Sequence, residues 1–250
     1  MDNRLKEVIN TYDNIVIFSG AGVSTLSGIS DYKSGFDYWS AHKEDYFSHQ
    51  EIMSNRMYEL DKPLFFEYYQ KMVEGLKNKE PNAAHYLANE LQITGKLLGV
   101  ITQNIDGLYD GLIPKEKLCE IHGNIKGYTC VKCGEFVEDV NVSASKRGIL
   151  HSDCCNWIVK PNVVLYGEVF KKEYAVKYKE MLKKADCILV MGTRLDVLTH
   201  NVEIGSSNAF KVLINNDKVP LYKRKYGTYS MDNVEINWGL EIIDDVKNSL

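Results

Sequence analysis

The sequence predicts an α/β fold with a doubly wound parallel sheet, and two observations support this prediction. Four short runs are almost entirely apolar and are bounded by polar residues or glycine, as expected for strands buried on both faces. These runs are Ile15–Ser19, Leu97–Thr102, Cys187–Met191 and Lys211–Ile214. Stretches with helical spacing lie between them, and strands that alternate with helices form parallel sheets covered on both sides.

Helices are expected at three places in this alternation. Their apolar residues recur every three or four positions, which is the period of an amphipathic helix. The three segments are Arg4–Tyr12, Asn82–Leu91 and Lys172–Lys184. Each lies next to a predicted strand in the sequence and would cover one face of the sheet.

Two regions interrupt the alternation and are expected to be insertions that leave the sheet and return to it. The first runs from Tyr32 to about Glu80, is rich in aromatic residues and is mainly helical in pattern. The second runs from Gly123 to about Lys160 and contains cysteines, glycines and short polar segments. Because no repeat or low-complexity linker separates the parts, we expect them to pack together.

The composition is typical of a globular protein and excludes several classes of function. The 250 residues are 44% hydrophobic and 26% charged, enough for one large core with an inserted module. A formal net charge of −4 argues against direct binding of nucleic acid, which depends on neutralising phosphates. We expect a cytoplasmic protein without a membrane partner, because no segment has the pattern of a signal peptide or a membrane helix.

The first predicted strand ends in a glycine-rich loop. The segment IVIFSGAGVSTLSGISDY, residues 15–32, passes from an apolar run into Gly20-Ala21-Gly22 and then into small hydroxyl residues. Such a loop before a helical turn places backbone N–H groups where a dinucleotide pyrophosphate binds. Since position 25 is Thr, the full G-x-G-x-x-G pattern is absent, and the loop alone is equally compatible with a structural turn.

Further polar motifs follow the other predicted strands. TQNIDGLY, residues 102–109, comes at the carboxyl end of the second strand, where open α/β sheets bind ligands, and contains Gln103, Asn104 and Asp106. Amide and carboxylate side chains of this kind are suited to holding a ribose and an amide. The later motifs are EIHGN (120–124), KPNVVLYGE (160–168), MGTRLDV (191–197) and VLINND (212–217).

Together these motifs resemble the sirtuins, a family of NAD-dependent protein lysine deacylases. The family pattern GAGxSxxSGIPDFRS corresponds to GAGVSTLSGISDYKS here, and the TQNxDGLH, HG, [RK]PxVVxFGE, GTSLxV and final Asn blocks have counterparts in the same order. The segment PNAAH, residues 81–85, also resembles the start of a family helix. The blocks extend from residue 15 to about residue 217, which is nearly the whole chain.

The resemblance implies a Rossmann-like doubly wound sheet with a smaller inserted domain made of a helical module and a zinc ribbon. On this basis we expect an NAD-binding domain composed of residues 1–31, 82–122 and 161–250. The small domain is expected to combine residues 32–81 with residues 123–160.

The resemblance also implies a reaction and a role for individual residues. NAD would be the co-substrate and an acyl-lysine protein or peptide the substrate, with nicotinamide, O-acyl-ADP-ribose and free lysine as products. His122 is expected to act as general base on a ribose hydroxyl, because an unperturbed histidine is largely neutral at pH 7. Asn104 and Asp106 are expected to assist catalysis by orienting the ribose and the nicotinamide amide.

Two sets of binding residues follow from the same resemblance. The residues expected to bind NAD are Gly20, Ala21, Gly22, Ser24, Asp31, Tyr32, Lys33, Gln103, Asn104, Asp106, Gly192, Thr193, Arg194 and Asn215. The residues expected to form an extended strand against the substrate backbone are Val163, Val164, Leu165, Tyr166 and Gly167.

The cysteines come close to a zinc-ribbon pattern. Cys130 and Cys133 have the C-x2-C spacing, but the second pair, Cys154-Cys155, is adjacent, and position 152, where the third cysteine of a regular ribbon would fall, is Ser152. We expect a structural zinc with four thiol ligands and with His151 as a possible substitute. The expected ligands are Cys130, Cys133, Cys154 and Cys155. The competing interpretation is a ribbon held by packing alone.

The sequence departs from the family pattern at four places, and two alternative functions stay open. Tyr32-Lys33 replaces Phe-Arg, Tyr109 replaces His, Arg194 replaces Ser and Ser30 replaces Pro. These changes are compatible with an unusual substrate or a slow enzyme, although acetyl is the default acyl group. The first alternative is a sirtuin-like mono-ADP-ribosyltransferase or NAD hydrolase, and the second is an NAD-binding sensor without turnover.

Overall fold

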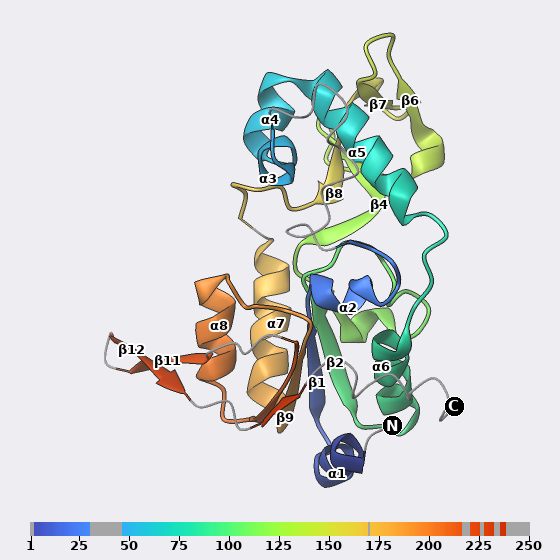
Figure 1. The fold of residues 1–250 in the computed structure, drawn as a ribbon. Coiled ribbons are helices and arrows are strands. Elements are labelled where there is room, and N and C mark those ends of the chain that lie inside the picture. Colours follow the sequence, from blue (N-terminus) through green and yellow to red (C-terminus); the bar gives the residue numbers. More distant parts are fainter. Residues whose placement is uncertain are drawn as a thin grey trace.

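A six-stranded parallel sheet forms the larger part of the computed structural model, which describes residues 3–30, 47–169, 171–216, 221–225, 228–232 and 236–238. The strand order is β13-β10-β9-β1-β2-β3 (Figure 1), and every neighbouring pair is parallel. The strands are β1 (Ile15–Ser19), β2 (Leu97–Thr102), β3 (Leu118–Glu120), β9 (Cys187–Met191), β10 (Phe210–Ile214) and β13 (Ile236–Trp238). The predicted α/β class and the four predicted strands are confirmed, the last strand beginning one residue earlier than expected.

Helices cover both faces of this sheet, as a doubly wound fold requires. Within β1, Ile15 and Ile17 pack into the core shared with the first pair of helices, whereas Val16 and Phe18 pack into the core on the opposite face. Residues alternate in this way because successive side chains of a strand point to opposite sides. The first pair of helices is α1 (Asn3–Thr11) and α6 (Ala83–Ile93), and the second pair is α7 (Lys172–Lys184) and α8 (Leu198–Gly205).

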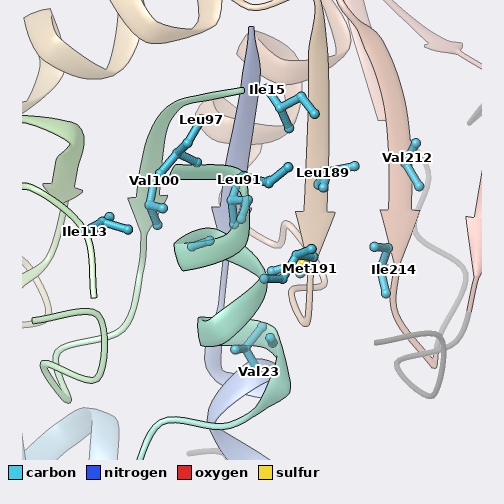
Figure 2. Packing of buried hydrophobic residues seen from close by; sticks show 14 of the residues in the cluster. Ile15, Val23, Leu91, Leu97, Val100, Ile113, Leu189, Met191, Val212 and Ile214 are labelled. Carbon is cyan, nitrogen blue, oxygen red and sulfur yellow. The ribbon is translucent and has the colours of Figure 1, made fainter. Parts of the chain in front are cut away.

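Figure 2 shows one of these two cores from close by. Apolar side chains from β1, β2, β9 and β10 meet Leu91 of α6 and Val23 of the short helix α2 (Ala21–Thr25). All are buried, so the chain immediately after the glycine loop is anchored by Val23 against the rest of the core. Burial of this kind fixes the position of the loop that precedes it.

The order of the strands places a topological switch point beside β1. The chain runs from β1 outward to β2 and β3 on one side, and then returns to add β9, β10 and β13 on the other. The connection that leaves β1 therefore continues toward β2, and the connection that leaves β9 continues toward β10, on the opposite side of the sheet order. In open α/β sheets a crevice forms at such a point, and ligands bind there.

A second, antiparallel sheet and three helices form a separate core above the parallel sheet (Figure 1). The strands lie in the order β5-β4-β8-β7-β6. They are β4 (Gly123–Cys130), β5 (Phe136–Val137), β6 (Val142–Ala144), β7 (Leu150–Ser152) and β8 (Trp157–Val163), and the helices are α3 (His49–Ile52), α4 (Asn55–Leu60) and α5 (Lys62–Leu76). The two insertions thus pack together: Tyr58 in α4, for example, donates a hydrogen bond of 3.1 Å to the carbonyl of Val159 in β8.

Local sequence explains where the helices that flank the two sheets begin. Asp61 caps α5 by accepting a hydrogen bond of 3.1 Å from the N–H of Leu64, and Asn82 caps α6 through the N–H of Ala84 at 2.9 Å. His85 in turn accepts from the N–H of Asn82 through Nδ1, so it helps to start its helix as predicted. The remaining elements are the 3-10 turns η3 (Lys115–Lys117) and η4 (Asp139–Asn141) and the hairpin of β11 (Leu221–Lys225) and β12 (Thr228–Asp232). Among the described helices, none combines the length and the apolar character needed to cross a membrane.

Candidate active site

The glycine loop after β1 lies against the loop after β9. The N–H of Gly20 donates to the carbonyl of Met191 at 3.0 Å, and the N–H of Gly22 donates to the carbonyl of Gly192 at 2.8 Å. A Cβ atom on Gly22 would lie 2.8 Å from the Gly192 oxygen, and one on Gly192 would lie 2.3 Å from the nitrogen of Val23. The close approach at the glycine loop is therefore made by the chain itself, and it excludes side chains at Gly22 and Gly192 whether or not a ligand binds.

Three predicted residues form a hydrogen-bonded group beside this loop. The Ser24 hydroxyl donates to Asp106 Oδ2 at 2.6 Å, and Asn104 Nδ2 donates both to Ser24 Oγ at 2.8 Å and to the carbonyl of Gly20 at 3.1 Å. Burial raises the pKa of the Asp106 carboxyl, while the hydrogen bonds from Ser24 and from the N–H of Leu108 partly offset this effect. The loops after β1 and β2 are thus fixed to each other through Asn104 and Ser24.

A second set of hydrogen bonds joins the loops after β2, β9 and β10. The Thr193 hydroxyl donates to Gln103 Oε1 at 2.8 Å, and the N–H of Gln103 donates to the carbonyl of Ser19 at 2.9 Å. Asn215 Nδ2 donates to the carbonyl of Thr193 at 3.3 Å. Predicted site residues from four strand ends therefore lie together at the carboxyl edge of the parallel sheet.

His122 follows β3 and lies at the same edge. Its Nδ1 is 2.8 Å from the carbonyl of Gln103, and because a carbonyl can only accept, Nδ1 carries the proton in the neutral ring. The lone pair of the neutral imidazole is then on Nε2. Burial lowers the pKa of His122, and its hydrogen bond to Gln103 opposes this shift. The sequence around it thus folds into a site where a histidine is neutral, oriented and able to accept a proton at one defined atom.

A second histidine lies beside His122, and the sequence analysis did not identify it. The ring centroid of His200, in α8, is 6.4 Å from that of His122, 5.9 Å from that of Phe18 and 5.4 Å from that of Tyr178. Burial, with a smaller effect of His122, lowers the pKa of His200 to about 4. His200 follows the MGTRLDV motif by three positions, but no spacing rule connects it to His122, so only the packing of α8 reveals the pair.

Glu120, two residues before His122, is also a group that the sequence analysis did not identify. Burial raises its pKa to about 7, and a hydrogen bond from Asn124 Nδ2 opposes this shift. The charge of Asp110 raises the pKa of Glu120 and that of Lys126 lowers it, and these two residues form an ion pair with each other. Glu120 therefore titrates near neutral pH at the edge of the site.

The segment expected to form a strand along the substrate, residues 163–167, begins in β8 and continues beyond it. Val163 is the last residue of β8, and no named strand covers residues 164–167. The strand ends because the next three N–H groups bond elsewhere: that of Val164 to the carbonyl of His122 at 2.8 Å, that of Leu165 to Glu168 Oε2 at 3.0 Å and that of Tyr166 to the carbonyl of Met53 at 3.0 Å. Tyr166 forms an isolated parallel bridge with Ser54, and Gly167 forms a turn with a φ of +88°. Pairing of residues 163–167 with a substrate backbone stays a prediction.

The remaining predicted NAD-binding residues divide into two groups. Ala21 begins α2, and Arg194 is an exposed residue of the loop after β9. Asp31, Tyr32 and Lys33 lie outside the described residues. The structure therefore brings together the predicted residues from strand ends and is silent on the segment that follows the glycine loop.

Four cysteines meet at the end of the antiparallel sheet. The Sγ atoms of Cys130, Cys133, Cys154 and Cys155 all lie within 4.8 Å of one another, and Cys133 and Cys154 are 3.7 Å apart. Four thiolates around zinc at a Zn–S distance of about 2.3 Å lie about 3.8 Å apart in a tetrahedron, so the cluster fits this metal. The adjacent pair reaches one site, and His151, whose Nδ1 is 3.1 Å from the carbonyl of Ile149, is outside the cluster.

The other two cysteines are separate from this cluster. Cys119 in β3 and Cys187 in β9 are fully buried in the parallel sheet. All six cysteines are free thiols in the structure.

Comparisons with known proteins agree on one family. The model of the Sir2 family matches residues 20–199. An NAD-dependent protein deacetylase of Clostridium perfringens is 36% identical over 196 residues, which cover 78% of this chain and 79% of that protein. The enzyme of the same name from Clostridium tetani is 34% identical over 230 residues, or 90% of this chain and 91% of the relative.

Solved structures show the same fold. A complex of Sir2 with a p53 peptide and NAD+ superposes with a TM-score of 0.80 at 23% identity and covers 99% of this chain and 97% of the other. Sir2Tm bound to a propionylated peptide gives a TM-score of 0.79 at 23% identity, over 98% and 95% of the two chains.

Proposed function

The chain belongs to the Sir2 family, and from this premise we propose that it is an NAD-dependent protein lysine deacylase. Its substrates would be NAD and an acyl-lysine protein or peptide, and its products nicotinamide, O-acyl-ADP-ribose and free lysine. Two observations support the proposal: relatives of at least 34% identity are named NAD-dependent protein deacetylases, and structures of the same fold contain acylated peptides or NAD+.

The observation that carries the proposal is the geometry of His122. The hydrogen bond from Nδ1 to the carbonyl of Gln103 fixes the ring, so Nε2 is the atom that would take a proton from a ribose hydroxyl. Because burial lowers the pKa of His122, the ring is neutral and ready to act as a base at pH 7. An idle histidine in a sensor would need neither this orientation nor this protonation state.

We propose that NAD binds along the carboxyl edge of the parallel sheet. The phosphates of NAD would accept hydrogen bonds from the backbone N–H groups of Gly20, Ala21 and Gly22. The ribose and the amide would be held by Ser24, Asn104 and Asp106. On the adenosine side, the site would be completed by Gln103, Thr193, Arg194 and Asn215. Gly192, which has no side chain, would allow the loop after β9 to lie close to the glycine loop. Asp31, Tyr32 and Lys33 stay in the proposal on the strength of the family pattern. Val163–Gly167 would lie along the substrate backbone and pair with it.

We also propose a structural zinc held by the four clustered cysteines. The separation of 3.7 Å between the sulfur atoms of Cys133 and Cys154 supports this ligand set. Zinc would supply a cross-link between β4 and the turn after β7. It would have no part in the chemistry, since these thiols lie in the antiparallel sheet and His122 at the edge of the parallel one.

The proposal also covers the division into domains and the location of the protein. The division into an NAD-binding domain of residues 1–31, 82–122 and 161–250 and a small domain of residues 32–81 and 123–160 is supported by the separate cores of the two sheets. A cytoplasmic location and the absence of a nucleic-acid or membrane partner are proposed from the sequence composition alone.

Mass spectrometry of an acetyl-lysine peptide, with and without NAD+, tests the proposed activity. The wild-type protein should remove one acetyl mass only when NAD+ is present. His122→Asn is the matched variant, because its side chain can still donate to the carbonyl of Gln103 but has no basic nitrogen. Loss of activity by a factor of about 10² or more in this variant is the expected result.

The other outcomes point to the alternative functions. If the peptide kept its acetyl group while NAD+ was cleaved, the protein would be an NAD hydrolase. If ADP-ribose became attached to protein, it would be a mono-ADP-ribosyltransferase. If NAD+ stayed intact in every reaction while still binding to the protein, a sensor would be the better description. Full activity of the His122→Asn variant would remove the proposed base.

A further inference from the structure

Ser152 occupies a buried position against the cysteine cluster. It is the last residue of β7, is 1% exposed, and stands where the spacing of a regular zinc ribbon would place the third cysteine. Its hydroxyl lies 3.2 Å from Cys130 Sγ and 3.2 Å from the carbonyl of Trp157. Cys130 is itself fully buried at the end of β4, so no water competes for this contact from the surface.

The hydroxyl has one proton and two acceptors. A serine O–H donates a single hydrogen bond, so the proton of Ser152 goes either to the sulfur or to the Trp157 carbonyl. A neutral thiol is a weak acceptor, whereas a metal-bound cysteine is a thiolate that carries negative charge. Hydrogen bonds to a charged acceptor are roughly twice as strong as neutral ones. With metal in the site, the proton of Ser152 therefore belongs on Cys130 Sγ.

We propose that Ser152 is a positioning residue of the metal site, which holds Cys130 by donating a hydrogen bond to its sulfur and leaves coordination to the four cysteines. The adjacent thiols of Cys154 and Cys155 supply the third and fourth ligands, and this frees position 152 for a hydrogen-bond donor. Partners of this kind, which do not touch the metal, typically change metal affinity by 10- to 100-fold. The inference rests on the zinc site proposed above and is independent of the deacylase reaction.

The test is a zinc competition experiment on the full-length protein. Wild type, Ser152→Ala and Ser152→Thr would be purified with zinc, and their metal affinity measured against a coloured chelator. We expect one zinc per chain in the wild type, a 10- to 100-fold loss of affinity in Ser152→Ala and less than a threefold change in Ser152→Thr, which keeps the hydroxyl. Ser143→Ala, an exposed serine on the neighbouring strand β6, is the control for a general effect on the sheet.

Cobalt(II) in place of zinc separates a positioning residue from a ligand. Its sulfur-to-metal absorption grows with the number of bound thiolates, so Ser152→Ala should keep the four-thiolate spectrum of the wild type, whereas Cys154→Ser should lose intensity. If Ser152→Ala failed to fold, Ser152→Thr against Ser152→Val would replace it, because these two side chains have the same shape and differ only in the hydroxyl.

The outcomes have distinct meanings. A wild type that binds no zinc would overturn the metal site and this inference with it, but not the deacylase. A normal zinc content together with equal affinity of wild type and Ser152→Ala would overturn this inference alone. A wild-type cobalt spectrum of only three thiolates would also overturn it, because the four cysteines would then not make up the whole coordination.

Discussion

Acidification from pH 7.5 to pH 5.5 is expected to lower the free energy of unfolding by about 2 kcal/mol, as the sum of two opposing effects that the fold creates. Among the residues that the structure describes, the buried His49, His85 and His200 weaken the fold as the pH falls, and the buried carboxyl of Glu120 strengthens it. Since the total stability of a protein of this kind is about 5–15 kcal/mol, the change is large enough to measure.

The histidines provide the destabilising part. Burial lowers the pKa of His49, His85 and His200 to about 4, from an ordinary value of 6.5. Below pH 6.5 these histidines therefore bind protons in the unfolded chain but stay neutral in the folded chain. The free energy of unfolding thus falls as the pH falls. Each histidine loses about 1.3 kcal/mol between pH 7.5 and pH 5.5, so the three together lose about 4 kcal/mol.

Glu120 provides the opposing part. Burial raises its pKa from an ordinary value of 4.5 to about 7, so the folded chain binds this proton before the unfolded chain does. The contribution of Glu120 to the free energy of unfolding therefore rises as the pH falls through 7. Between pH 7.5 and pH 5.5 it rises by about 2 kcal/mol. The smaller effects of His122, whose pKa is lowered, and of Asp106, whose pKa is raised, have opposite signs and partly cancel.

Urea unfolding followed by tryptophan fluorescence at the two pH values measures the sum. Glu120→Gln keeps an acceptor for Asn124 but cannot titrate. In this variant the decrease in the free energy of unfolding between pH 7.5 and pH 5.5 should therefore grow to about 4 kcal/mol. His85→Gln keeps a side chain suited to the capping box of α6 but removes one titrating histidine. In this variant the decrease in the free energy of unfolding between the two pH values should shrink to below about 1 kcal/mol. The same pH dependence in wild type and in both variants would refute the reasoning, because it would mean that neither group titrates abnormally in the fold.

Two further predictions concern the site. Gly22→Ala should lower the free energy of unfolding by roughly 1–3 kcal/mol, because the new Cβ would lie 2.8 Å from the Gly192 oxygen. Thermal denaturation checks this against Gly75→Ala, where a Cβ has no neighbour within 4 Å and no loss is expected. In the pH profile of kcat/KM, activity should fall on the acid side with a midpoint below 6.5, because the pKa of His122 is lowered and the neutral base disappears as pH falls through it. A midpoint above 6.5 would contradict the burial of His122.

The parallel sheet was largely predictable because its central strands have a clear pattern. β1, β2 and β9 are almost entirely apolar and have the predicted bounds. The edge strands β3 and β13 contain three residues each, which is too short for any period to be visible in the sequence. The short helices α3 and α4 are fixed by their serine caps and by packing on the antiparallel sheet, and packing cannot be inferred from periodicity.

The candidate site was predictable in position and less so in its interactions. Polar residues that follow parallel strands must gather at one edge, so the meeting of Asn104, Thr193 and Asn215 follows from the strand assignment alone. The structural role of Gly22 and Gly192 could not be predicted from the sequence. These two glycines are 170 positions apart, and only the tertiary fold brings them into contact. His200 was missed for the same reason.

The backbone around His122 belongs to both sheets at once. Its carbonyl accepts the hydrogen bond from Val164 at 2.8 Å, and its neighbour Gly123 pairs with Val163 so closely that a Cβ atom would lie 2.1 Å from the carbonyl oxygen of Asn162. His122 thus lies where the backbone passes from the parallel sheet to the antiparallel one. Because this backbone is bonded to the residues that follow β8, we expect any displacement of the antiparallel sheet to move His122 as well.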